Sequence, residues 1–180
     1  MPERAAPETF ATSLLREHGA EIFGFLARAH GSGEAEEIYG LFVEAVLRSS
    51  ASYRGDASPR TWGYLLARSA ARRHARRRAR ARALFTPIAH HPSALERPVT
   101  GPEREAIAGS EVACLDRSLS PEERELLVLR LGRGFRFSEI AIILGEVEDG
   151  APGQERARAE ARLRKRFQEL RDRLRAARPS

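Results

Sequence analysis

The chain has 180 residues, a formal net charge of +6 and a pI near 10.5, and 42% of its residues are hydrophobic. This length fits one domain or two small ones, and no stretch reaches the roughly 18 apolar residues that a membrane helix needs. The N-terminal residues argue against a secretory signal because they include acids and lack an apolar core, and a single cysteine, Cys114, excludes an intramolecular disulfide.

A period of 3.6 residues dominates the hydrophobic pattern and predicts an all-α fold. A first helix is expected over about Thr9–Ala29, and a second begins with Ser32 as its N-cap. Acidic residues follow in the predicted first turn of the second helix, where the helix dipole favours them: Glu34, Glu36 and Glu37. The segment "YRGDASP", Tyr53–Pro59, is predicted to be a turn.

The next segment, "RTWGYLLARSAARRHARRRARAR", begins as a helix with an apolar face and ends as a belt of arginine. Its predicted buried side chains are Trp62, Leu65, Leu66 and Ala70. Residues 68–82 contain eight arginines, His74 and no acid. Like charges four residues apart cost a helix about 0.2–0.5 kcal/mol per pair, and a polyanion would convert that cost into binding. A solvated helix end that frays is the alternative interpretation.

Residues 84–102 contain four prolines and no hydrophobic period, which predicts a linker between two domains. A helix after Glu103 would carry an apolar face of Ile107, Val112, Leu115 and Leu119. The next helix has a predicted capping box, with Ser120 as N-cap, Pro121 at the first position and Glu123 at the third.

Two further helices are predicted after the "GRG" that ends this one. The short segment "FSEIAIILG" would direct Ile140, Ile143 and Leu144 inward, with Gly145 as C-cap. The last helix would end at about Ala176, and its apolar stripe is Leu163, Phe167, Leu170 and Leu174. This order indicates a helix-turn-helix unit whose last helix enters the major groove. A plain helical hairpin has a similar pattern and remains open.

Two segments together resemble a bacterial RNA polymerase sigma factor of the extracytoplasmic-function type. They are "YRGDASPRTWGYLLARSAARRHARRR" and "LSPEERELLVLRLGRGFRFSEIAIILG". The resemblance implies two small helical domains joined by a linker: a region 2-like bundle at 9–83, a linker at 84–102 and a region 4-like helix-turn-helix domain at 103–176. It also implies core RNA polymerase and promoter DNA as partners, with an anti-sigma factor as a further one, and no membrane.

The resemblance also implies roles for individual residues. Promoter minus-10 contacts, including capture of an extruded base, would come from Tyr53, Arg54, Gly55, Asp56, Ala57, Ser58, Ser69, Arg72, Arg73 and Arg76. Contacts with the minus-35 duplex would come from Arg158, Arg162, Lys165 and Arg166. Core polymerase would be bound by Glu34, Glu36, Glu37, Ile38, Leu41 and Phe42.

The chain departs from the family pattern at two places. Gly40 and Leu41 stand where the family has Gln-Glu in the polymerase-binding helix, and a glycine inside a helix costs about 1 kcal/mol against alanine. The turn before the last helix, "EVEDGAPGQERAR", is longer than in the family and contains Glu146, Glu148 and Asp149. Acids beside a DNA-reading helix repel phosphate. The turn is therefore either a harmless surface loop or a change that alters or weakens minus-35 recognition, and an altered turn on an otherwise intact fold is expected.

No phosphate-binding loop, nucleophile elbow or set of metal ligands is present in the sequence, so no enzyme activity, catalytic residue, cofactor or metal is predicted. The expected function is that of an alternative sigma factor, cytoplasmic and associated with the nucleoid. Two alternatives stay open. One is a sigma-like regulator that binds DNA or an anti-sigma factor without initiating transcription, and the other is a general basic nucleic-acid-binding protein.

Overall fold

The computed structural model describes residues 7–84 and 119–176, and these residues are almost entirely helical. The first three helices, which we call the first unit, are α1 (Pro7–His30), α2 (Ser32–Ser49) and α3 (Pro59–Leu84). The last three, the second unit, are α5 (Pro121–Leu127), α6 (Phe137–Ile143) and α7 (Gly153–Ala176). No strand occurs within these two ranges, which confirms the predicted all-α class.

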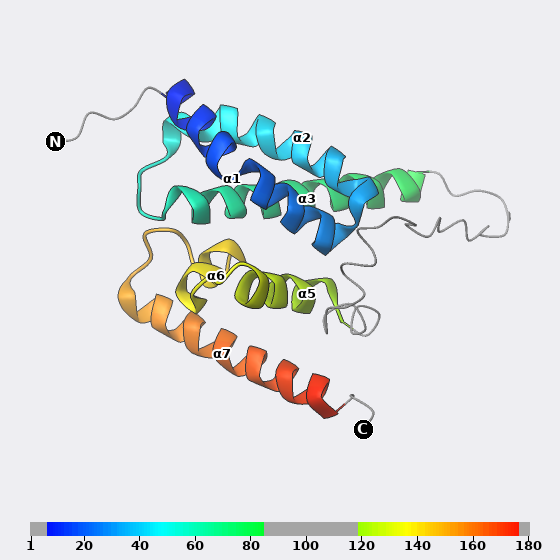
Figure 1. The fold of residues 1–180 in the computed structure, drawn as a ribbon, viewed down its shortest axis with the longest axis vertical. Coiled ribbons are helices and arrows are strands. Elements are labelled where there is room, and N and C mark those ends of the chain that lie inside the picture. The colour runs from blue at the N-terminus through cyan, green and yellow to red at the C-terminus, as the bar shows by residue number, and fades with distance from the viewer. Residues whose placement is uncertain (1–6, 85–118, 177–180) are drawn as a thin grey trace, which may run out of the picture.

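The first unit is a bundle in which each of α1, α2 and α3 packs against the other two (Figure 1). Its core is formed by large apolar side chains at helical spacing, including Ile22, Phe25, Phe42 and Tyr64. Trp62 is 8% exposed, which confirms the prediction that it is a core residue. Full burial of an aliphatic or aromatic side chain contributes about 1.5–3 kcal/mol, so these residues hold the bundle together.

Local capping signals fix the helix ends of the second unit. The Ser120 hydroxyl accepts a hydrogen bond from the Glu123 amide at 3.2 Å, and the Glu123 carboxylate accepts one from the Ser120 amide at 2.9 Å, so the predicted capping box is confirmed. After a π-helical turn at Val128–Gly132, Gly134 adopts a φ of 69°. Gly145 ends α6 with the same φ, a left-handed conformation that glycine adopts without steric cost.

The two units pack against each other, mainly through α3 and α6 (Figure 1). Tyr64 of α3 meets Phe135 edge to face with ring centroids 4.8 Å apart, and the guanidinium of Arg60 lies 4.1 Å from the centre of the Phe135 ring. Arg60 also donates a hydrogen bond to the Arg133 carbonyl at 2.9 Å. The buried apolar residues of both units form one continuous cluster.

A buried ion pair crosses this interface. Arg68 of α3 donates to Glu125 Oε2 of α5 at 2.7 Å and to the Leu144 carbonyl of α6 at 2.8 Å. The side chains of Arg68 and Glu125 are only 6% and 9% exposed. Removing either partner would leave the other charge buried and unpaired, so the pair couples the packing of α3 to that of α5 and α6.

Several expectations need correction. Gly31, with a φ of 87°, is the residue that precedes α2, and Ser32 is already helical, so Ser32 is not the N-cap. The first turn of α2 contains Glu34 but not Glu36 or Glu37. On α3, two side chains expected to be buried, Leu65 and Leu66, are half-buried, while two expected in the arginine belt, Arg68 and His74, are buried.

The predicted linker at 84–102 falls outside the described residues, except for Leu84, which ends α3. The predicted helix containing Ile107, Val112 and Leu115, and with it Cys114, also falls outside them. The division into domains at 9–83 and 103–176 therefore stays a prediction.

His30 makes the folded chain sensitive to acid. Burial lowers the pKa of His30 below its ordinary value of 6.5, Glu125 opposes that shift, and His74, Arg124 and Arg68 add to it. A lowered pKa favours the neutral imidazole in the folded state, so stability is present above about pH 6.5 and is lost as pH falls through the lowered pKa.

His30→Gln should therefore reduce the loss of thermal stability between about pH 7.5 and pH 5.5. His18→Gln, the same substitution elsewhere on α1, is the control, and an equal loss in H30Q and the parent would contradict this.

Candidate nucleic-acid interface

An aromatic stack supports the loop that precedes α3. Tyr53 stacks on Phe10 of α1, with ring centroids 4.5 Å apart and planes 10° apart, and its ring centre lies 5.2 Å from that of Trp62. The Tyr53 hydroxyl donates a hydrogen bond of 2.6 Å to the Ala57 carbonyl. These contacts hold both ends of the loop against the first unit.

The tip of this loop is open to solvent. Gly55 has a φ of 86°, which favours glycine, and Arg54 Nε lies 3.4 Å from Asp56 Oδ2. Ser58 immediately precedes α3 and caps its N-terminus, because the Ser58 hydroxyl accepts a hydrogen bond from the Thr61 amide at 3.1 Å. Of the six loop residues predicted to capture a base, Tyr53 is half-buried and Ala57 is buried, whereas the other four are exposed: Arg54, Gly55, Asp56 and Ser58.

One face of α3 continues from this loop as an exposed basic strip. Ser69, Arg72 and Arg76 are exposed, and their spacing of three and four residues places them on the same side of the helix. Arg73 is half-buried and donates to the Leu41 carbonyl of α2 at 3.5 Å, so it braces α3 against α2. The strip is therefore formed by Ser69, Arg72 and Arg76, without Arg73.

The predicted polymerase-binding residues lie on both sides of α2. Ile38 and Phe42 are 1% and 0% exposed and pack in the core of the first unit, so they do not form part of its surface. The surface part of the prediction is formed by Glu34, Glu36, Glu37 and Leu41.

Two of these acids surround a buried histidine of α3. His74 Nε2 lies 3.7 Å from Glu34 Oε2, and His74 Nδ1 lies 3.6 Å from Glu37 Oε2. Glu34 also forms an ion pair with Arg78. Two acids of α2 therefore lie against the C-terminal half of α3, where Glu34 offsets the charge of Arg78.

Gly40 lines a groove of about 500 Å³ between α2 and α3. A Cβ atom at Gly40 would meet no atom within 4 Å, so packing in the free chain does not require glycine there. Gly40→Ala should therefore stabilise the free chain by about 1 kcal/mol in urea unfolding. Gly33→Ala, which also adds a Cβ into open space but near the start of α2, is the control. An unchanged or lower unfolding midpoint for G40A would show that alanine is strained at this position.

The four predicted minus-35 residues are all exposed on α7, outside its buried stripe of Ala159, Leu163, Phe167 and Leu170. Acids engage three of them. Arg166 donates to Glu146 at 2.6 Å, Arg162 lies 3.8 Å from Glu146, and Lys165 lies 3.8 Å from Glu169.

Residues 14–81 match the family model described as Sigma-70 region 2. The first unit is similar to this family from within α1 almost to the end of α3. The match supports the similarity of the first unit to region 2 of the RNA polymerase sigma factors, a family that binds core polymerase and promoter DNA. No curated protein and no solved structure matches the chain significantly.

The region 2-like unit contains the loop, the basic strip and the surface acids of α2 within the matched residues. Residues 119–176 lie outside this match, so the helix-turn-helix assignment of α6 and α7 stays a prediction. Within the described ranges, no group of three or more His, Cys, Asp or Glu side chains could hold a metal ion. None of the helices described here is long and apolar enough to span a bilayer.

The burial of Arg68 and His74 on α3, and that of Glu125 on α5, is not predicted from the sequence. The sequence places Arg68 among the arginines of a belt that is expected to face solvent. Its burial depends on an ion pair with Glu125, which is 57 residues away along the chain. His74 belongs to the same belt and is enclosed by α2. Arg68 lies four residues, about one helical turn, after the buried Tyr64, and this spacing is the one feature of the sequence that indicates its burial.

Proposed function

We propose that this protein is an alternative sigma factor of the extracytoplasmic-function type, which binds core RNA polymerase and directs it to promoters. The observation that carries the proposal is the Sigma-70 region 2 match over residues 14–81. The chemistry of the matched unit agrees with it, because an exposed loop and a strip of guanidinium groups follow one another on one side of α3. Guanidinium groups bind phosphate strongly and release counterions from DNA.

In this proposal the protein acts by binding and not by covalent chemistry. Arg72 and Arg76 would neutralise phosphates of the promoter strand, and the tip of the loop at 54–56 would meet an extruded base. The rigid stack of Tyr53 on Phe10 would hold the loop in place, which lowers the entropy lost on binding. The surface acids of α2 would face the polymerase.

Reconstitution with core polymerase tests the proposal. The purified chain is expected to co-elute with core enzyme and to support transcripts with defined start sites from a library of genomic fragments of the source organism. Core enzyme alone is the control. A chain that neither joins core enzyme nor yields defined transcripts would overturn the proposal.

A second candidate is a sigma-like DNA-binding regulator that does not initiate transcription. It is favoured by the ion pairs between Glu146 and two arginines of α7, which reduce the positive charge available to a minus-35 element. This candidate predicts selective DNA or protein binding without transcripts in the same reconstitution.

A further inference from the structure

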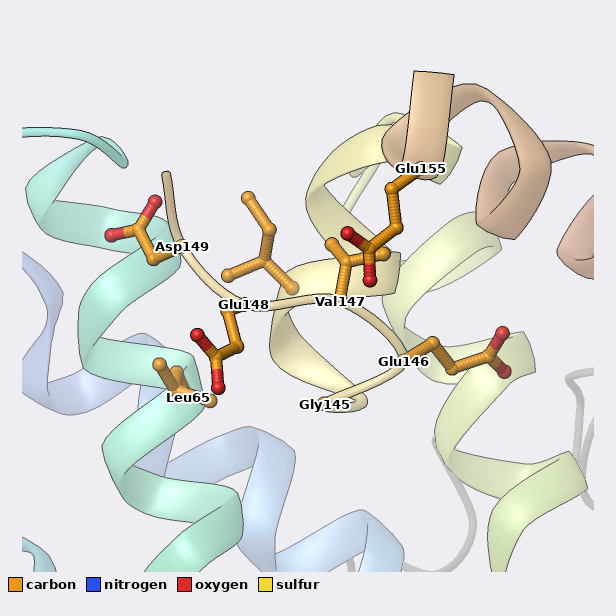
Figure 2. Close-up of a pocket in the computed structure, with 8 residues that line it drawn as sticks. Leu65, Gly145, Glu146, Val147, Glu148, Asp149 and Glu155 are labelled. Carbon is orange, nitrogen blue, oxygen red and sulfur yellow. The ribbon is translucent and has the colours of Figure 1, made fainter. Parts of the chain in front are cut away.

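The turn between α6 and α7 lies against both surfaces that are predicted to contact DNA. We call residues 145–152 the acidic turn, because they include Glu146, Glu148 and Asp149. Figure 2 shows that Glu148 and Asp149 lie on the side of α3, while Glu146 extends away from it. The turn also borders a hollow of about 370 Å³, which Leu65 of α3 lines as well.

On the side of α7, Glu146 binds two of the predicted minus-35 arginines. Its Oε1 accepts a hydrogen bond from Arg166 at 2.6 Å, and its Oε2 lies 3.8 Å from Arg162. The Glu146 side chain is 19% exposed, so solvent screens these pairs less than it screens a fully exposed ion pair. A carboxylate with one guanidinium on each oxygen occupies the positions that a DNA phosphate would need.

On the side of α3, the same turn lies against the predicted minus-10 surface. A Cβ atom built on Gly150 would lie 3.6 Å from Asp56 Oδ2, and one built on Gly145 would lie 4.0 Å from Arg72. Burial raises the pKa of the Tyr53 hydroxyl, and the carboxylates of Asp149 and Asp56 raise it further, which agrees with a position of the turn beside the loop. The turn therefore extends from the basic strip to the loop.

The packing of the two units holds the turn in this place. Arg68 donates to the carbonyl of Leu144, the residue just before the turn, and its partner Glu125 is itself buried. Because the carbonyl at the end of α6 is attached to α3 in this way, the turn stays on the DNA-facing side while the units remain packed.

We propose that the acidic turn is an intramolecular substitute for promoter phosphate, which engages two predicted minus-35 arginines of the free chain through Glu146, lies beside the predicted minus-10 surface, and must move away before DNA binds. The proposal rests on the proposed function, since that function assigns the two surfaces to DNA. On this proposal the turn weakens binding of the free chain to nucleic acid while the two units remain packed.

The test compares two variants of the free full-length chain that carry the same change in charge. The turn variant is Glu146→Gln with Glu148→Gln and Asp149→Asn. The control variant is Glu17→Gln with Glu44→Gln and Asp172→Asn, three exposed acids outside the turn whose ion pairs involve no predicted DNA-binding residue. Fluorescence anisotropy measures binding to a random-sequence duplex and to a random-sequence single strand over a range of salt concentrations.

The turn variant is expected to bind the duplex at least about fivefold more tightly than the control variant, with a salt slope steeper by about 1–2. The reason is that Arg162 loses its pair with Glu146, and Arg166 loses its hydrogen bond with Glu146 and keeps only the 3.8 Å pair with Glu122. Tighter binding to the single strand is expected as well. Equal affinities for the two variants, or no change in either, would overturn the proposal. Should the triple turn variant fail to fold, E146Q against E160Q gives the same duplex comparison.

This assay contains no polymerase, so its result is independent of the reconstitution that tests the function. If the chain supports transcripts but its turn and control variants bind DNA equally, the proposal about the turn is overturned and the proposed function is not. If the turn variant binds DNA more tightly but the chain never joins core enzyme, the proposal about the turn is supported and the proposed sigma function is overturned.

Discussion

Arg68→Ala and Glu125→Ala should each destabilise the folded chain by about 3–5 kcal/mol, because each substitution leaves a buried charge without its partner. A loss of this size is a large fraction of the 5–15 kcal/mol that stabilises a typical domain. The effect should appear as a lower midpoint in urea unfolding followed by circular dichroism. The loss also removes a contact between the two units, so it should affect their packing as well as the stability of each.

The double variant Arg68→Met with Glu125→Leu separates the charge from the packing. Replacing both members of a buried pair by apolar side chains of similar volume is often neutral or stabilising, so most of the loss should be recovered. Arg78→Ala is the matched control on the same helix, since Arg78 pairs with Glu34 where both side chains are at least 40% exposed. That substitution should cost less than about 1 kcal/mol. A single R68A variant as stable as the parent would show that Arg68 and Glu125 do not carry the interface.

The helix ends that depend on local chemistry could be predicted from the sequence. Ser120 and Glu123 satisfy each other's backbone amides within one turn, and Gly145 ends α6 because it can adopt a positive φ. Ser32 shows the limit of such reasoning. Its type favours an N-cap, but Gly31 before it takes a φ of 87°, which moves the start of α2 back by one residue.

Tertiary contacts are the part that the sequence did not reveal. Arg68 is buried because Glu125 and the Leu144 carbonyl approach it from the second unit, and no pattern within α3 announces that approach. The same limit applies to Arg73. Its side chain donates a hydrogen bond to a carbonyl of α2 and is therefore not part of the exposed strip. The length and charge of the acidic turn were visible in the sequence, but its position between α3 and α7 required the fold.

The candidate site was found chiefly through the motif that begins at Tyr53. The loop and the strip both lie within the residues that match Sigma-70 region 2, while their role in DNA binding stays a prediction. The motif could not separate residues that hold the loop from residues that face solvent, because both kinds occur within six positions. Tyr53 and Ala57 belong to the first kind, and Arg54 and Asp56 belong to the second.

Replacing Arg72 and Arg76 together with alanine should weaken promoter binding by the polymerase-bound chain at least about tenfold, since each charged hydrogen bond contributes about 1.5–3 kcal/mol. The slope of log affinity against log salt concentration should fall by about 2, one for each phosphate that is no longer neutralised. Arg16→Ala with Arg48→Ala removes the same charge from exposed positions on α1 and α2 and should leave the slope nearly unchanged.

The stability of the R72A/R76A variant is a second measurement, and it is expected not to fall although the DNA affinity does. Arg72 and Arg76 are like charges four residues apart on an exposed helix face, and alanine has the highest helix propensity. The R72A/R76A chain should therefore be as stable as the parent, or more stable by a few tenths of a kcal/mol. Lower DNA affinity combined with undiminished stability identifies a surface kept basic for binding. A parallel loss of both would mean that the two arginines support the fold, and unchanged affinity would remove the strip from the interface.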